Sequence, residues 1–154
     1  MIQRIQTLYL LVVTAMMACT LFLPIAYFNV AGDMTYTLTA FSMNGITGPI
    51  WLVGVLLAVA TLLPFVTIFL FKNRKIQIGL CAAEFVLQLG TLLVFALFFW
   101  VLMPQAVSEV GVELVSKNFG WAAVLPIASM PLTYLAGRAI LKDEVLVKSL
   151  DRIR

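Results

Sequence analysis

Long runs of apolar residues, separated by short polar stretches, dominate the pattern of this sequence. Four runs stand out: Ile5–Phe28, Pro49–Phe71, Ile76–Met103 and Trp121–Leu141. Each is at least as long as the roughly 20 residues that a helix needs to cross a hydrocarbon core about 30 Å thick. The pattern predicts an all-α membrane protein, a single four-transmembrane-helix bundle that spans residues 1–154.

The segment between the first two runs has a weaker pattern. Threonines alternate there with Tyr36, Leu38 and Ala40, which is the period of a strand, and Asn44-Gly45 supplies a turn. A small β-hairpin or an edge strand over the helix ends fits this pattern. A loop that only caps the bundle fits it too, and we favour the loop because two strands alone are marginally stable.

The segment between the third and fourth runs predicts a helical turn at the membrane interface. Val107, Val110 and Leu114 recur at helical spacing, with acidic residues on another face. Pro104 is expected to end the third run, because proline cannot continue the helical hydrogen-bond ladder.

The tail, Lys142–Arg154, mixes charged residues with an apolar stripe. Glu144 precedes Lys148 by four residues, the favourable order for a helical ion pair. We expect a helical extension of the fourth run. Its apolar face is a candidate partner face, although a segment that sets topology and packs is the plainer interpretation; it consists of Leu146, Leu150 and Ile153.

Composition supports lipid as the solvent. The chain is 63% hydrophobic and 11% charged, with a mean hydropathy of +1.08, which leaves too little polar surface for a soluble globule. The net charge of +3 does not indicate a nucleic-acid partner, because the basic residues lie at the predicted membrane edges.

Charge and tryptophan positions predict the orientation. All Lys and Arg residues except Lys117 fall on one side, and Trp51, Trp100 and Trp121 fall near the opposite interface. The positive-inside bias then places both termini in the cytoplasm. A cleaved lipoprotein signal ending at Cys19 is the alternative, but the first run is too long for a signal peptide.

Some chemistry is excluded or reduced by residue types. Histidine is absent, which removes the commonest general base and metal ligand. Cys19 and Cys81 fall at different depths of their runs, so we expect two free, buried thiols. No phosphate-cradling glycine loop, metal-ligand cluster or acidic catalytic dyad occurs, and we expect no enzyme activity, no metal and no cofactor.

One ionisable residue, Glu84, lies deep inside a predicted span, and this marks it as a functional candidate. It belongs to a stripe with helical spacing that must face other helices because lipid cannot satisfy polar groups: Cys81, Glu84, Gln88 and Thr91. Candidate partners at similar depth are Thr14, Thr61, Thr133 and Tyr134, and Arg138 is a further candidate that would reach the stripe from nearer the interface. The stripe fits interhelical hydrogen bonding best, and a proton path is the alternative.

Small residues at helical spacing predict close helix packing. They are Gly54, Ala58, Ser129, Thr133 and Gly137. The first and third runs also open alike, with Arg4-Ile-Gln6 and Lys75-Ile-Gln77. This similarity suggests a duplication of two helices into four.

Three segments resemble one known family: Met1–Leu11, Lys72–Gln77 and Lys142–Arg154. The family comprises small Gram-negative bacterial membrane proteins catalogued as domain of unknown function 4293, and the resemblance covers essentially the whole chain. It implies a four-helix protein of the inner membrane without an assigned activity.

Two functions follow as hypotheses. The first is a non-enzymatic accessory or scaffold subunit of an envelope complex, motivated by short loops and the patterned tail. The second is a small oligomeric transporter or proton-coupled carrier that uses Glu84. The expected partners are the lipid bilayer and another membrane protein or a second copy of the chain. An enzyme acting on lipid ranks last, because no nucleophile and base pair is visible.

Overall fold

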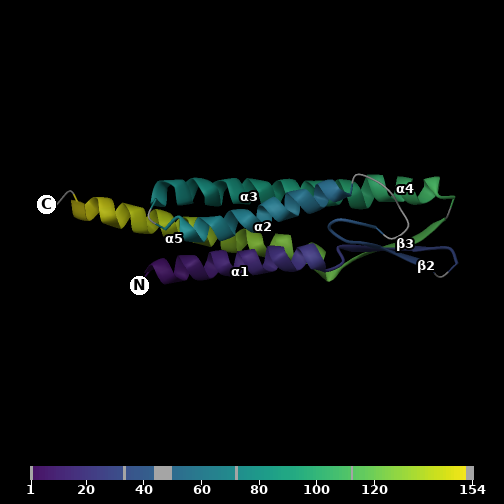
Figure 1. The fold of residues 1–154 in the computed structure, drawn as a ribbon, viewed down its shortest axis with the longest axis horizontal. Helices are drawn as coiled ribbons and strands as arrows, with labels where there is room; N and C mark the ends of the chain where they lie inside the picture. The colour runs from purple at the N-terminus through teal and green to yellow at the C-terminus, as the bar shows by residue number, and fades with distance from the viewer. Residues whose placement is uncertain (1, 33, 44–49, 72, 112, 152–154) are drawn as a thin grey trace.

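Four long helices lie side by side and form most of the molecule (Figure 1). The computed structural model describes residues 2–32, 34–43, 50–71, 73–111 and 113–151. The long helices are α1 (Ile2–Phe22), α2 (Trp51–Phe69), α3 (Arg74–Leu97) and α5 (Val124–Asp151). All four are long and apolar enough to cross a membrane, in agreement with the four runs of the sequence.

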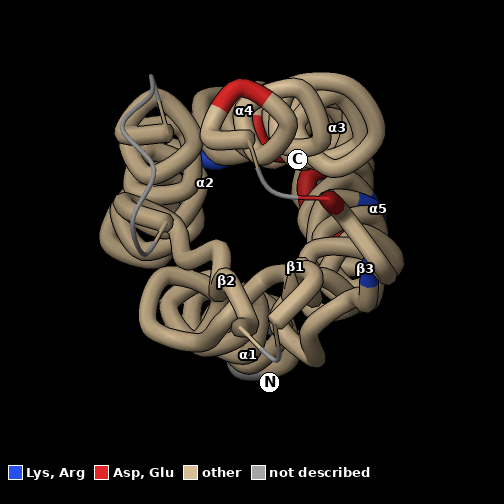
Figure 2. The backbone as a smooth tube through the Cα atoms, turned by 90° about the vertical axis from the view of Figure 1, so that its right-hand side faces the viewer, with Lys and Arg blue, Asp and Glu red and all other residues tan. Residues whose placement is uncertain are grey.

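The helices form a ring in which α1 and α3 do not touch as neighbours. Each of these two helices packs against both α2 and α5. Viewed along the bundle, the order around the ring is α1, α2, α3, α5 (Figure 2). Residues far apart in the sequence therefore meet in the interior, where α1 contacts α5.

The first helix is shorter than the first apolar run. We predicted a span to Phe28, but α1 ends at Phe22 and strand β1 (Ala26–Val30) follows. Pro24 separates the two, and proline has no N–H for the helical ladder. The apolar run continues into β1 because alternate residues of this strand are buried. These residues are apolar because they pack in a protein core, and not because they belong to the first helix.

A three-stranded antiparallel sheet covers one end of the bundle, which we call the sheet end. β1 lies between β2 (Met34–Leu38) and β3 (Leu114–Phe119). A turn joins β1 to β2 and contains Gly32 at φ 98°, a backbone conformation that favours glycine. A strand, β2, is therefore present where we favoured a capping loop, but it pairs backward with β1 through the turn at Gly32. The turn expected at Asn44-Gly45 lies outside the described residues.

The third helix passes through Pro104 instead of ending there. A π-helical segment, η1 (Phe98–Leu102), joins α3 to α4 (Met103–Glu109) without a break. The Met103 N–H donates to the Phe98 carbonyl, one residue further back than in an α-helix. This wider turn precedes Pro104, whose missing N–H and ring are tolerated near the start of α4.

The second loop is half helix and half strand. Its first part is α4, with Val107 buried as a helical turn predicts. Gly111 at φ 78° then reverses the chain, and Leu114 belongs to β3 rather than to a helix. Pairing with β1 explains the strand, because Phe28 and Lys117 are partners across the ladder.

The last helix is preceded by a 3-10 turn, η2 (Trp121–Ala123). Gly120 lies just before it, and its N–H donates to the Ile25 carbonyl oxygen at 2.8 Å. α5 then runs continuously to Asp151, which confirms the expected helical extension of the fourth run as far as the described residues reach.

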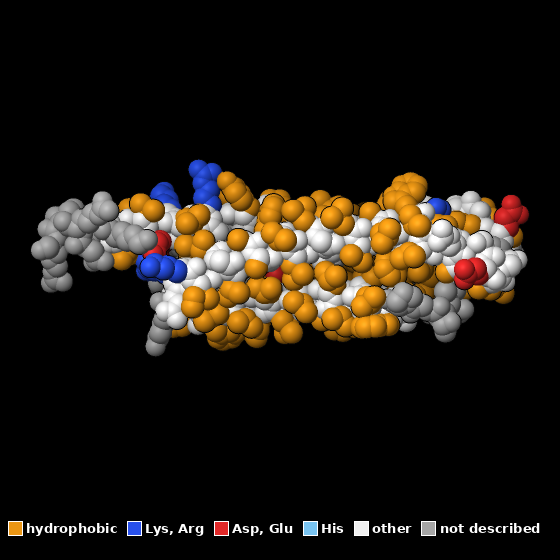
Figure 3. Space-filling view, turned by 90° about the horizontal axis from the view of Figure 1, so that it is seen from above, with side chains coloured by type: hydrophobic (Ala, Val, Ile, Leu, Met, Phe, Trp, Pro, Cys, Tyr) orange, Lys and Arg blue, Asp and Glu red, His pale blue; other side chains and the backbone are white. Residues whose placement is uncertain are grey.

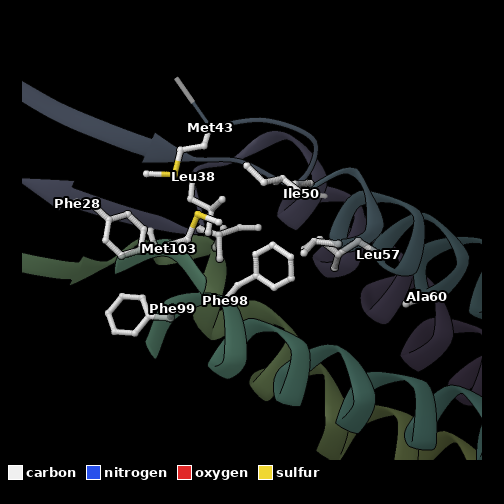
Figure 4. Packing of buried hydrophobic residues seen from close by; sticks show 14 of the residues in the cluster. Phe28, Leu38, Met43, Ile50, Leu57, Ala60, Phe98, Phe99 and Met103 are labelled. Carbon is white, nitrogen blue, oxygen red and sulfur yellow. The ribbon is translucent and has the colours of Figure 1, made fainter. Parts of the chain in front are cut away.

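The larger hydrophobic core lies where the sheet meets the helices. Phe28 of β1, Leu38 of β2 and Phe98 and Met103 from the long third helix point toward one another there (Figure 4). A second cluster joins α1, α3 and α5 farther along the bundle: Leu10, Cys81, Ala136 and Ile140. The sheet end thus has a packed core of its own, continuous with the bundle.

The outside of the bundle is apolar, and its charges lie toward the ends (Figure 3). We call the end opposite the sheet the basic end, because Lys and Arg side chains gather there. Both ends of the chain lie at the basic end (Figure 1). One ion pair holds two helices together there, between Arg74 Nη2 and Asp143 Oδ2 at 3.3 Å.

The two cysteines are free, and they differ in burial. Cys81 is buried, as predicted, but Cys19 is exposed on the surface of the bundle. Met17 and Thr20 occupy the inward positions of that turn of α1, so the intervening Cys19 faces outward.

Candidate functional site

The polar stripe of α3 lies in the interior of the bundle. Cys81, Glu84, Gln88 and Thr91 are all buried, with Glu84 exposing 1% and Gln88 0% of their surface. Their spacing of three or four residues puts them on the face that α3 turns toward α2 and α5. Gln77 adds a fifth member at the basic end of the same face.

Gln88 is the centre of a short hydrogen-bond network. Its Nε2 donates to Glu84 Oε1 at 3.1 Å on the same helix and to Thr133 Oγ1 at 3.0 Å on α5. Thr133 in turn donates to the Ser129 carbonyl oxygen at 3.2 Å. The network therefore ties α3 to α5 halfway along the bundle.

Two acceptors in this network have no partner among the described residues. They are Glu84 Oε2 and Gln88 Oε1, both fully buried. An unpaired buried polar atom costs about 1–3 kcal/mol, so the pair forms a local polar defect. A water molecule or a proton shared with a neighbouring oxygen is the chemistry that would satisfy such acceptors.

One of the five predicted partners contacts the stripe by a hydrogen bond, and this is Thr133. Thr14 and Thr61 lie on the correct helices, but each hydroxyl donates to a carbonyl of its own helix, four residues back. Tyr134 is 59% exposed and Arg138 is also exposed, so both face outward. The depth of each candidate along its helix followed from the sequence, but the face of the helix that each one occupies did not.

The small residues of α5 line its contacts with two helices. Ser129 Oγ lies 3.6 Å from Met17 Sδ of α1, and a Cβ added to Gly137 would lie 3.5 Å from Cys81 Cβ of α3. On α2, Gly54 is buried and Ala58 is partly buried. Gly54 makes its close approach to Ala40 and Phe41 of the connecting segment rather than to another helix.

The buried face of α1 repeats in α3 at a constant spacing of 71 residues. The matching pairs are Gln6 and Gln77, Leu10 and Cys81, Val13 and Glu84, Met17 and Gln88, and Thr20 and Thr91. Both helices contact α2 and α5, as an approximate two-fold axis along the bundle requires. This regularity supports the suggested duplication. Three members of the stripe, Cys81, Glu84 and Gln88, occupy positions that are apolar in α1, whereas Thr91 corresponds to Thr20.

Two glutamines near the basic end were not among the predicted site residues. Gln6 Nε2 donates to the Ala139 carbonyl oxygen at 3.1 Å, and Gln77 Nε2 donates to the Thr67 carbonyl oxygen at 3.3 Å. The available signal was the repeated Ile-Gln dipeptide that opens both helices. Each glutamine joins its helix to a different neighbour.

The sheet end carries an aromatic cluster. Phe99 packs on Phe28 with ring centroids 5.7 Å apart and stacks on Phe119 at 3.9 Å. The Lys117 ammonium lies 5.3 Å from the centroid of the Trp100 ring, a cation–π contact. Phe119 and Trp100 are nevertheless 62% and 64% exposed, so the cluster reaches the surface.

The predicted partner face of the tail is only partly described. Leu146 is 44% exposed on α5, whereas the Leu150 side chain and Ile153 lie outside the described residues. Among the described residues, no group of three His, Cys, Asp or Glu side chains is placed to hold a metal ion.

A family model described as "Domain of unknown function (DUF4293)" matches residues 2–153. The chain belongs to this family. The match covers nearly the whole chain, including all four helices and the sheet. No curated protein matches the sequence. Membership of the family thus assigns no activity to the chain.

Proposed function

We propose that this DUF4293 protein is a non-enzymatic scaffold subunit of the bacterial inner membrane, whose sheet end holds another envelope component. The observation that carries the proposal is the packed sheet end itself. The three strands β1, β2 and β3, together with η1 and α4, form a packed core there that is larger than a simple connecting loop needs. A rigid surface of this kind suits binding rather than transport.

The proposal places both chain ends in the cytoplasm. Lys and Arg side chains gather at the basic end, which the positive-inside bias assigns to that compartment (Figure 3). Trp51, Trp100 and Trp121 are more than half exposed toward the sheet end, as residues of a membrane–water interface are. Sheet and α4 then project into the periplasm.

Single cysteines test this orientation. In a variant with Cys19 and Cys81 replaced by alanine, we expect a membrane-impermeant maleimide to label Val115→Cys in intact spheroplasts. Val145→Cys is expected to react only after the membrane is opened. Both positions are exposed, at the sheet end and the basic end respectively. The reverse pattern would overturn the orientation.

The partner is proposed to add an extended segment to the free edge of β3. β3 pairs with β1 along one side, and it is an edge strand of the described sheet. Val115 and Phe119 of β3 are 69% and 62% exposed, and Trp121, just after the strand, is 88% exposed. An open edge with apolar side chains is a surface onto which another strand adds.

Photo-crosslinking in native membranes tests the scaffold. A probe at Trp121 is expected to give one discrete protein adduct, which Val115→Lys removes without lowering the amount of the chain. Val145→Lys, the same change at an exposed position of the basic end, should leave the adduct intact. An adduct that survives Val115→Lys, or its complete absence, would contradict the proposal.

One observation favours a second candidate function, a proton-coupled carrier. The unpaired Glu84 Oε2 and Gln88 Oε1 are placed where a proton or water would bind. Four helices enclose little pathway, so this function needs an oligomer. Reconstituted protein should then show proton-driven flux that Glu84→Gln abolishes, and unchanged flux would remove the candidate.

A further inference from the structure

A groove of about 440 Å³ opens on the surface of the bundle between α3 and α5. Its walls are mostly apolar, with Ile78, Ala82, Phe85 and Val86 on the α3 side. This volume falls in the roughly 300–1,000 Å³ range of pockets that hold small organic ligands. Cys81 and Thr133 form part of its floor, and Thr133 also accepts the hydrogen bond from Gln88, so the groove lies on the outer side of that network.

The α5 wall of the groove carries a cation. Arg138 lines the groove together with Tyr134, and both side chains are exposed. Arg138 forms no ion pair with any residue that the structure describes, whereas Arg74 is paired with Asp143. Lys142, also exposed, follows one helical turn later, so two cations stand at the basic end of the groove.

The depth of Arg138 suits a lipid phosphate. Asp143 marks the level at which α3 begins, and Arg138 lies five residues before it, roughly 7–8 Å deeper along the helix. A long arginine side chain bridges such a distance by extending toward the headgroups. The groove therefore has a cation near the headgroup level and apolar walls deeper in the bundle. This order matches a phospholipid, whose phosphate lies above its acyl chains.

We propose that this groove binds one anionic phospholipid of the inner leaflet. Arg138 and Lys142 contact the phosphate, Tyr134 donates to it, and an acyl chain lies against Ala82 and Val86. A second copy of the chain fits less well, because a two-fold axis through the groove would bring the same cations together. The inference rests on the membrane placement proposed above, but not on the scaffold partner.

Native mass spectrometry of the purified, delipidated protein tests the site. Titration with phosphatidylglycerol and phosphatidylcholine is expected to show preferential retention of the anionic lipid. Arg138→Gln should reduce that preference about fivefold, the effect of removing one cation near a lipid surface. Lys117→Gln, the same charge change at the sheet end, should leave it unchanged, and Arg138→Lys should retain most of it.

A second variant separates the groove from the charge. Ala82→Trp fills the groove from an exposed position without altering any charge, and it should lower retention of phosphatidylglycerol. Inorganic phosphate should not displace the lipid, since the acyl chain is part of the contact. Equal retention of both lipids, or a preference unaffected by Arg138→Gln and Ala82→Trp, would overturn the proposal, whether or not the crosslinking experiment finds a partner.

Discussion

Gln6 and Gln77 are structural counterparts, each donating its side-chain amide to a backbone carbonyl oxygen of a neighbouring helix. Gln6 reaches Ala139 of α5, and Gln77 reaches Thr67 of α2. The two bonds therefore join different helix pairs at the basic end. Each of the four helices takes part in one of these bonds, which suggests that both halves of the duplication kept the same interhelical hydrogen bond.

Replacing either glutamine by leucine should destabilise the bundle by about 0.5–1.5 kcal/mol, the usual value of one hydrogen bond. Because the two bonds share no partner, the effects should add within about 0.5 kcal/mol in the double variant. Unfolding in mixed micelles measures both. Gln105→Leu, at an exposed position, is the control. A double variant whose loss of stability differs strongly from the sum of the two single losses would show that the two hydrogen bonds are not independent.

Glycine substitutions should divide into two groups. A Cβ at Gly54 would meet the Phe41 ring and the Ala40 carbonyl oxygen, and one at Gly120 would meet the Pro24 backbone. Alanine at either position should cost about 1–3 kcal/mol, as overpacking does. Gly79→Ala and Gly90→Ala point into open space within helices and should be neutral or stabilising by up to about 1 kcal/mol. Thermal unfolding distinguishes the groups.

Phe99→Ala should loosen the sheet end selectively. Phe99 is 5% exposed and contacts aromatic rings of β1 and β3, so its truncation should cost about 3–5 kcal/mol. Hydrogen exchange should rise in β1 and β3 and stay unchanged in the basic half of α1. Leu93→Ala, at a 72% exposed position of α3, should alter neither. Uniform loss of protection would show that the two ends are not separable.

The network around Gln88 should be strongly non-additive. Gln88→Leu removes both donated bonds and leaves the Glu84 carboxyl buried without a partner. The free energy of unfolding should fall by about 1–3 kcal/mol. The double variant Glu84→Leu/Gln88→Leu should be more stable than Gln88→Leu alone, because no carboxyl then remains unsatisfied. Unfolding measurements on the three variants suffice. A double variant less stable than Gln88→Leu would point to a further role of Glu84.

The helices were predictable because lipid-spanning length and apolar composition are local properties. Helical spacing likewise placed Glu84 and Gln88 on one inner face. Hydropathy did not separate α1 from β1, because Ala26 and Phe28 are also apolar and are buried in the core beneath the sheet. The strand β3 was also missed, because its pairing partner lies far away in the sequence.

Partners of the stripe were harder to predict than the stripe itself. Depth along a helix follows from the sequence, and on that ground Thr133 and Tyr134 were equally good candidates. Only the rotation of α5 decides between them, burying Thr133 and exposing Tyr134. Rotation depends on packing between helices, and α5 packs against both α1 and α3.

The central position of β1 constrains how the protein is made. β1 pairs on one side with β2, which follows directly, and on the other with β3, which is encoded more than 80 residues later. During synthesis its second edge remains open until residue 119 has been translated and brought across. Helices α1 and α2 precede this point in the chain, so they can form early, whereas an intact sheet requires most of the polypeptide.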